Sequence, residues 1–248
     1  MATVLGVAVT ARNLGFFALG ELSRGMGNSV TFLKDLWPPD PAVAPALTEA
    51  MLETIQMAYL GTFLGFLAAL PMGVLGARNV SPRWGVASAR LVLALVRSIP
   101  VLLWALIFVV IFGLGPLAGT LGIAVYTLSY LGKLYYEGVE AVDPEVIEAV
   151  KATGCSRPQL VRYAVLPEAA NTILSQLMFM LEYNVRASSV VGFVGAGGIG
   201  FYMFSYINTF DYQKLTTAIL LTLAVVLALD FLSARLRDRY LAPYQGQH

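Results

Sequence analysis

Five long apolar stretches constrain this chain more than any other feature of its sequence. A helix of about 20 apolar residues crosses the hydrocarbon core of a bilayer. Only 12% of the residues are charged, whereas soluble domains carry about 25%. We therefore predict an all-α integral membrane protein with five core transmembrane helices, preceded by an N-terminal helix or interfacial segment. The apolar stretches cover roughly residues 52–76, 88–113, 116–136, 169–191 and 213–234.

The residues before the first apolar stretch do not form a clear span. Residues 1–22 are apolar, but Arg12 lies near their middle, so we expect a short helix. No basic flank precedes them, so a cleavable signal is not expected. The spacing of Leu22, Met26, Val30 and Leu33 predicts an amphipathic helix at the membrane interface. We divide the chain into an N-terminal helix with an external loop (1–47), a transmembrane domain (48–236) and a cytoplasmic tail (237–248).

The distribution of lysine and arginine predicts the orientation of the chain. Basic residues are enriched in cytoplasmic loops. Placing the loop at 137–167 in the cytoplasm puts most basic residues near the spans on that side, and it leaves Arg24, Lys34 and Lys214 outside. The inner basic residues are then Arg78, Arg83, Arg90, Lys133, Lys151, Arg157, Arg162, Arg235, Arg237 and Arg239.

The longest polar interval between two apolar stretches, residues 148–167, is expected to form two short helices outside the bilayer. Gly154 suits the end of the first helix, because a residue without a side chain readily adopts the left-handed conformation. Ser156 followed by Pro158 suits the start of the second helix, and Pro167 is expected to end the loop. Such a helical pair is either an ordinary loop or a contact surface for another protein.

The spacing of residues in this loop resembles a family signature. Glu148-Ala149-Val150, then Gly154 and Leu166-Pro167, is similar to the EAA loop in permease subunits of binding-protein-dependent ABC importers. Val150 and Ala164 depart from the family pattern but keep its apolar character. In that family the loop docks on a cytoplasmic ATPase. The resemblance implies an ATPase-coupling site formed by Glu148, Ala149, Lys151, Gly154, Arg157, Leu166 and Pro167.

A glycine-rich run at residues 195–200 matches a dinucleotide-binding fingerprint in its letters. That fingerprint requires a preceding strand and a βαβ unit, whereas this run follows an apolar helical stretch. We expect its glycines to let a short outer segment pack tightly or re-enter the membrane. The run also resembles the same importer family. Its glycines are Gly195, Gly197, Gly198 and Gly200.

Several polar residues lie in or at the end of the fourth apolar stretch. Glu182 and Arg186 are four residues apart and can form an ion pair on one helical face. They can also line a translocation path in which Arg186 meets an anion, and the two interpretations are compatible. Asp230 and Lys133 are expected to be interface anchors. The candidate path residues are Glu182, Asn184, Arg186, Ser188 and Ser189.

The sequence contains no recognisable catalytic or metal-binding motif. It contains no phosphate-binding loop of the form G-x-x-x-x-G-K-[ST], so the chain is not itself an ATPase. Its single histidine, His248, is the last residue, and Cys155 is its single cysteine. We therefore expect no catalytic residues, no metal site and no cofactor. A net charge of +1 gives no reason to expect nucleic-acid binding.

The resemblance extends over most of the chain and is closest to phosphonate and phosphite importer permeases. It implies a MetI-like permease fold, a homodimer in the bacterial inner membrane, and a path for phosphonate or a related phosphorus oxyanion. The implied partners are two copies of an ATPase that binds ATP and Mg²⁺, and an extracytoplasmic binding protein. Alternatives are another small solute in the same class, such as phosphite, phosphate or an amino acid, or an ion-coupled secondary transporter.

Overall fold

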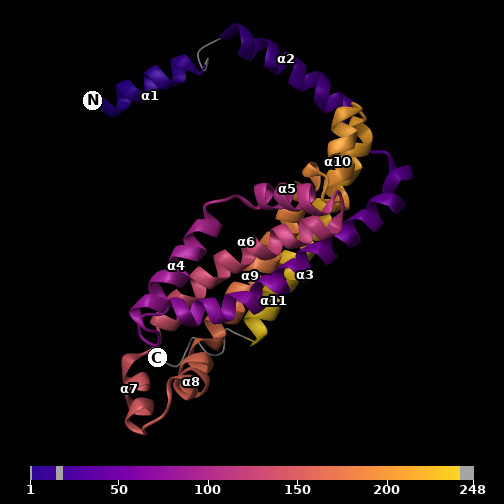
Figure 1. The fold of residues 1–248 in the computed structure, drawn as a ribbon. Coiled ribbons are helices and arrows are strands. Elements are labelled where there is room, and N and C mark those ends of the chain that lie inside the picture. Colours follow the sequence, from indigo (N-terminus) through magenta and orange to yellow (C-terminus); the bar gives the residue numbers. More distant parts are fainter. Residues whose placement is uncertain (1, 15–18, 241–248) are drawn as a thin grey trace.

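The computed structural model describes residues 2–14 and 19–240, and every regular element in that part of the chain is helical (Figure 1). The predicted tail at 237–248 lies outside the described residues from 241 onward. In chain order the elements are α1 (Ala2–Asn13), α2 (Leu19–Asp35), η1 (Pro41–Val43), α3 (Ala44–Gly76), α4 (Arg83–Arg97), α5 (Val101–Phe112), α6 (Pro116–Glu140), α7 (Pro144–Ala152), α8 (Arg157–Leu160), η2 (Val161–Val165), α9 (Leu166–Val191), η3 (Gly192–Val194), α10 (Gly198–Asn208) and α11 (Tyr212–Tyr240).

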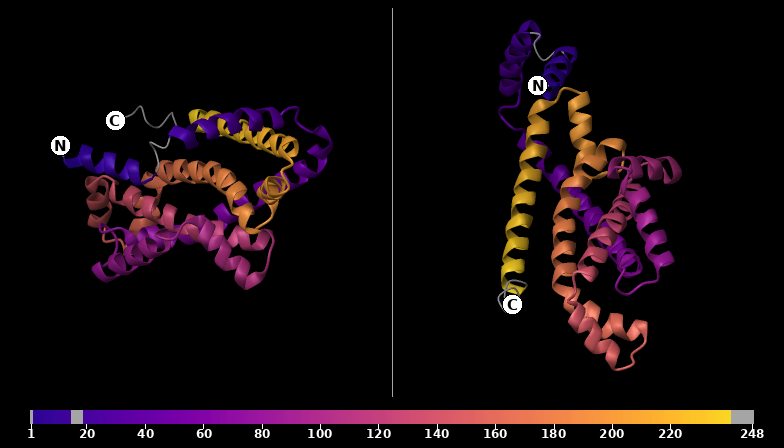
Figure 2. Two further views of the ribbon diagram at one scale, coloured as in Figure 1. Left: turned by 90° about the horizontal axis from the view of Figure 1, so that it is seen from above. Right: turned by 90° about the vertical axis from the view of Figure 1, so that its left-hand side faces the viewer.

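Helices α3, α6 and α9 form the centre of the bundle, and α11 runs alongside α9 (Figure 2). Small residues allow α3 and α6 to pack closely along their length. A Cβ atom built at Gly65 would come within 2.6 Å of the Thr127 side chain, and one at Gly61 within 2.7 Å of Ile123. Glycines at such contacts let membrane helices approach each other. The α3–α6 pair is therefore the scaffold on which the other helices pack.

The five predicted apolar stretches correspond to α3, the α4–α5 pair, α6, α9 and α11, and the all-α membrane class is confirmed. In the described residues three helical runs are long and apolar enough to cross a membrane, namely Pro41–Gly76, Arg157–Val194 and Tyr212–Leu236. A fourth is present if α4 and α5 count as one span. Helix α6 is not among these runs, and it packs on α3, α4, α5 and α9.

The predicted span at 88–113 is broken into two helices. Helices α4 and α5 meet at an angle of 83° (Figure 1). The break falls at Ser98-Ile99-Pro100, because proline donates no backbone hydrogen bond and disfavours helical geometry in the residue before it. Across the bend, the Trp104 indole N–H donates to the Val96 carbonyl oxygen at 3.1 Å. The apolar stretch at 88–113 therefore forms two differently directed helices and not one straight span.

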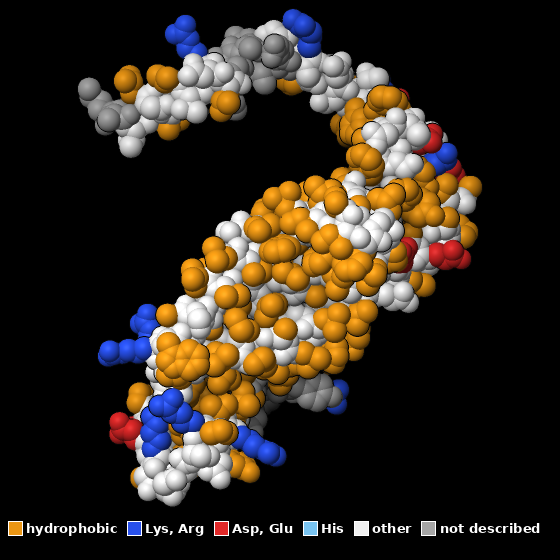
Figure 3. Space-filling view, viewed as in Figure 1, with side chains coloured by type: hydrophobic (Ala, Val, Ile, Leu, Met, Phe, Trp, Pro, Cys, Tyr) orange, Lys and Arg blue, Asp and Glu red, His pale blue; other side chains and the backbone are white. Residues whose placement is uncertain are grey.

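The two N-terminal helices extend away from the bundle (Figure 1). Helix α1 is short, as predicted, and α2 contains the predicted amphipathic stretch. Phe32 of α2 packs edge-on against Tyr212 at the start of α11, with ring centroids 5.0 Å apart. In the space-filling view, apolar side chains cover the visible face of the bundle, and lysine and arginine gather mainly at the end that holds α7 and α8 (Figure 3).

Candidate coupling and translocation sites

Helices α7 and α8 form a compact pair that projects from one end of the bundle (Figure 1). The Asp143 carboxylate accepts a hydrogen bond from the Glu145 backbone N–H at 2.8 Å and caps the start of α7. Gly154 follows the end of α7 with φ of +77°, the left-handed conformation predicted for it. The Ser156 N–H donates to the Gln159 side chain at 2.8 Å and caps α8. The predicted helical pair is therefore confirmed.

Pro167 lies at the start of the membrane helix α9, where the loop was predicted to end, but no break separates the loop from this helix. Helix α8 passes through a π-helical turn, η2, directly into α9. The whole run from Arg157 to Val194 is helical. Pro167 lies in the first turn of α9, where the missing N–H is tolerated. The second helix of the pair, α8, is thus a continuation of the membrane helix α9. A displacement of α8 is transmitted to α9 without an intervening loop.

The α7–α8 pair has an exposed outer surface and a buried base. Ile147 and Leu160 are buried and belong to the same apolar cluster as Val139 of α6 and Ala169 of α9. This cluster fixes the pair to two of the three central helices. Five of the seven predicted coupling residues are exposed on the pair or in its turn, Leu166 is half-buried, and Pro167 is exposed at the start of α9. The five are Glu148, Ala149, Lys151, Gly154 and Arg157.

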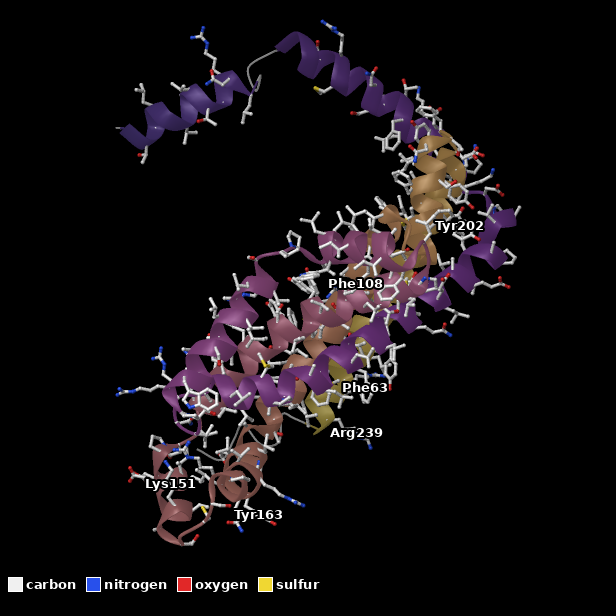
Figure 4. All side chains as sticks on the ribbon, viewed as in Figure 1. Phe63, Phe108, Lys151, Tyr163, Tyr202 and Arg239 are labelled. Carbon is white, nitrogen blue, oxygen red and sulfur yellow. The ribbon has the colours of Figure 1, made fainter. Side chains whose placement is uncertain are left out.

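The sequence analysis missed Tyr163, which is 67% exposed near the coupling residues. Figure 4 shows Tyr163 and Lys151 at the same end of the molecule. The Arg162 guanidinium carbon lies 5.6 Å from the centre of the Tyr163 ring. An exposed tyrosine in a membrane protein usually suggests an anchor at the lipid interface. Nothing in the sequence pattern separates that role from a contact with a partner.

The glycine-rich run connects α9 to α10 and packs against α3. The Gly198 N–H donates to the Glu53 carboxylate at 3.3 Å, and the Ile199 N–H donates to the Thr54 hydroxyl at 2.8 Å. These two α3 side chains satisfy N–H groups at the start of α10. A Cβ atom at Gly200 would overlap the Ser189 carbonyl oxygen. The run therefore packs tightly, one of the two arrangements that the sequence analysis left open.

Three of the predicted path residues lie inside the bundle. Asn184 is fully buried, and its amide nitrogen donates to the hydroxyls of Thr62 on α3 and Thr127 on α6, each at 2.8 Å. Ser188 is fully buried and donates to the Asn184 carbonyl oxygen at 2.6 Å, and Ser189 is also buried. This geometry assigns them to the contact between α3, α6 and α9. In this conformation they do not line an accessible path.

Arg186 lies on the other side of α9 and pairs with Asp230 of α11. One guanidinium nitrogen, Nη1, contacts both Asp230 carboxylate oxygens, at 3.1 and 3.0 Å. The two side chains are 44% and 39% exposed. The sequence analysis considered Glu182, which is half-buried one turn earlier on α9, as the partner of Arg186. It also expected Asp230 to be an interface anchor. The structure gives Asp230 a partner that the sequence did not indicate, because α11 places its carboxylate against Arg186.

The helical bundle with its projecting α7–α8 pair agrees with the family to which the sequence is similar. Residues 61–241 match the model of the family described as binding-protein-dependent transport system inner membrane component. The chain belongs to this family. It is the membrane permease subunit of an ABC importer, and it is not catalytic, since ATP binding lies in the partner ATPase. The family also implies a binding protein as a partner.

Two relatives of this permease come from Stutzerimonas stutzeri. A putative phosphite transport system permease protein is 32% identical over 218 residues, which are 88% of this chain and 77% of the relative. A phosphite transport system permease protein is 32% identical over 244 residues, which are 97% and 88% of the two chains. The fold is similar to an inward-facing structure of the methionine ABC transporter MetNI, with a TM-score of 0.71, 24% identity and coverage of 81% and 98%. The MetI-like fold is thereby confirmed.

Proposed function

We propose that this permease carries a phosphorus oxyanion, phosphite or a phosphonate, across the bacterial inner membrane. The observation that carries this proposal is the likeness along 97% of the chain to a phosphite permease. The arginine on the α9–α11 face supports the same substrate class, because a guanidinium group binds oxyanions through paired hydrogen bonds. The binding protein delivers the substrate, and this permease admits it to the membrane.

The exposed surface of the α7–α8 pair is the proposed docking site for the ATPase. Glu148, Ala149, Lys151, Gly154 and Arg157 supply the contact surface. The buried base of the pair joins it to α6 and α9. Movement of the ATPase is thus transmitted to two central helices as a rigid displacement. This role places α7, α8 and the end of α11 in the cytoplasm, in agreement with the basic residues at that end of the bundle (Figure 3).

The proposed assembly is a homodimer with the translocation path between the two copies. Its support is the half-exposed Arg186–Asp230 pair, which lies within two candidate membrane spans. Charged side chains within membrane spans almost always face a bundle interior or a water-filled cavity, because contact with lipid alone is costly. A second copy that encloses a water-filled path on this side would remove that cost. Glu182, on the same helix, is proposed to contribute to the lining of the path.

Reconstitution tests the proposed function. The permease is purified with its ATPase and placed in vesicles, and uptake of phosphite, methylphosphonate and phosphate is measured with the binding protein present. We expect uptake of a phosphorus oxyanion that requires both ATP and the binding protein. Uptake driven by an ion gradient alone would contradict the importer mechanism. ATP-driven uptake of a different solute class would contradict the substrate.

A further inference from the structure

The Arg186–Asp230 pair leaves most of the guanidinium group available. Both contacts to the carboxylate come from the same nitrogen, Nη1. Within the part of the chain that the structure describes, Nη2 and Nε of Arg186 make no hydrogen bond. A guanidinium group carries five N–H donors in a flat fork. One edge of the fork can therefore bind a second anion while Asp230 remains in contact with Nη1.

The Arg186–Asp230 pair lies on a largely apolar surface that also carries Glu182, one turn earlier on α9, and Arg235, whose guanidinium carbon lies 4.5 Å from the centre of the Phe231 ring. On α9, Val190 is 52% exposed one turn after Arg186. On α11, Leu227 and Phe231 flank Asp230 and are 58% and 61% exposed. Both helices belong to candidate membrane spans. Charged residues within spans almost always face a bundle interior or a water-filled cavity, so this surface is unsuited to contact with lipid alone.

We propose that Arg186 and Asp230 together form an oxyanion-binding site in which Arg186 binds the anion and Asp230 sets how tightly it is held. This inference rests on the proposed function, since it places the site on the path for phosphorus oxyanions. Asp230 is a positioning residue: its carboxylate holds Nη1 and turns the remaining N–H groups of the fork outward. Two N–H donors on one edge match two oxygens of a phosphite or phosphonate group.

The negative charge of Asp230 also weakens binding, and transport requires weak binding. A site on a path must bind its ion well enough to admit it and loosely enough to release it. The Asp230 carboxylate and a bound oxyanion share one guanidinium group and repel each other, because both are negatively charged and lie a few ångströms apart. An arginine without this partner would retain the anion. The ion pair thus converts a strong anion site into a transient one.

Direct binding to the assembled transporter tests the site without relying on transport. Phosphite is titrated calorimetrically into the permease–ATPase complex in detergent, without ATP or binding protein. Asp230→Asn should bind phosphite about tenfold more tightly or better, because the repelling charge is removed, and Asp230→Glu should resemble the unaltered chain. Arg186→Gln should lose phosphite binding. The matched control is Asp211→Asn, which removes the similarly exposed Lys214–Asp211 pair at the outer start of α11 and should leave binding unchanged.

A charge swap separates this role from a purely structural ion pair. The variant carrying Arg186→Asp and Asp230→Arg keeps the attraction between α9 and α11 but moves the guanidinium to the other helix. We expect it to assemble and melt like the unaltered complex and to lose most phosphite uptake in vesicles. Normal uptake by the swapped complex, or unaltered phosphite affinity in Asp230→Asn, overturns the inference.

These outcomes are distinguishable from a failure of the proposed function. If the unaltered complex shows no ATP-driven phosphite uptake, the substrate proposal fails. The binding titration still decides whether the Arg186–Asp230 pair is an oxyanion site. Phosphite that binds equally well in Arg186→Gln and in the unaltered complex rules out the site even where uptake is normal.

Discussion

Replacing Asn184 with alanine should destabilise the permease and leave its substrate affinity unchanged. The Asn184 amide donates to the hydroxyls of Thr62 and Thr127 at 2.8 Å each and is fully buried. A hydrogen bond between membrane helices contributes about 0.6 kcal/mol on average, and one in a soluble protein about 1 kcal/mol. The two bonds therefore contribute about 1–2 kcal/mol. The cavity left by alanine adds on the order of 1 kcal/mol, so we expect a total loss of about 2–3 kcal/mol.

The assay is reversible unfolding of the purified permease in mixed micelles, followed by circular dichroism. Asn208→Ala is the matched control, because Asn208 is exposed and its amide nitrogen donates to the Phe204 carbonyl oxygen within its own helix. It should change stability by less than about 0.5 kcal/mol. A double-mutant cycle of Asn184→Ala with Thr62→Val should give a coupling energy of about 0.5–1 kcal/mol. Unchanged stability of Asn184→Ala together with a shifted half-saturating phosphite concentration would refute the reasoning and place Asn184 on the path.

Three further substitutions test the packing around the two sites. Gly154→Val should reduce co-purification of the ATPase, because a side chain in the left-handed conformation costs about 1–2 kcal/mol. Gly154→Asn should retain the ATPase, and equal co-purification with both variants would contradict this prediction. Gly200→Ala should lower the melting temperature through overlap with an α9 carbonyl, while Gly6→Ala, in open space, should not. Glu140→Gln should cost about 1–2 kcal/mol in chemical unfolding, since the half-buried Glu140 pairs with Arg90 at 2.6 Å; no loss would show that the pair adds nothing.

Local rules predicted the coupling pair from the sequence, because the information lies within a few residues. Gly154 marked the end of a helix through its conformational freedom, and Ser156 with Pro158 marked the start of the next. The continuity through Pro167 was not predicted. A proline in the interior of a helix breaks it, whereas a proline in the first turn is tolerated. The sequence did not reveal the π-helical turn at Val161–Val165, which joins α8 to α9 just before Pro167.

The partners of the polar residues in α9 could not be predicted, because they depend on which helices are neighbours. Asn184 bonds to Thr62, 122 residues away, and Arg186 pairs with Asp230, 44 residues away. The four-residue spacing suggested Glu182 as the partner of Arg186, because residues four apart lie on the same face of a helix. Contacts between different helices cannot be read from such a spacing. Asn184 and Arg186 are both polar residues of α9, yet the first makes a buried contact between helices and the second a half-exposed ion pair. The sequence of α9 alone does not distinguish these two environments.

The central claim is that the partner ATPase binds the α7–α8 pair on the cytoplasmic side of the membrane. The most direct test places a single cysteine on that surface, Ala149→Cys in a Cys155→Ser background, and measures its labelling and cross-linking in vesicles of known orientation. We predict labelling by an impermeant thiol reagent from the cytoplasmic side only, and a cross-link to the ATPase that blocks this labelling. A residue that is labelled from the outer side, or that never cross-links to the ATPase in an active complex, would contradict the claim.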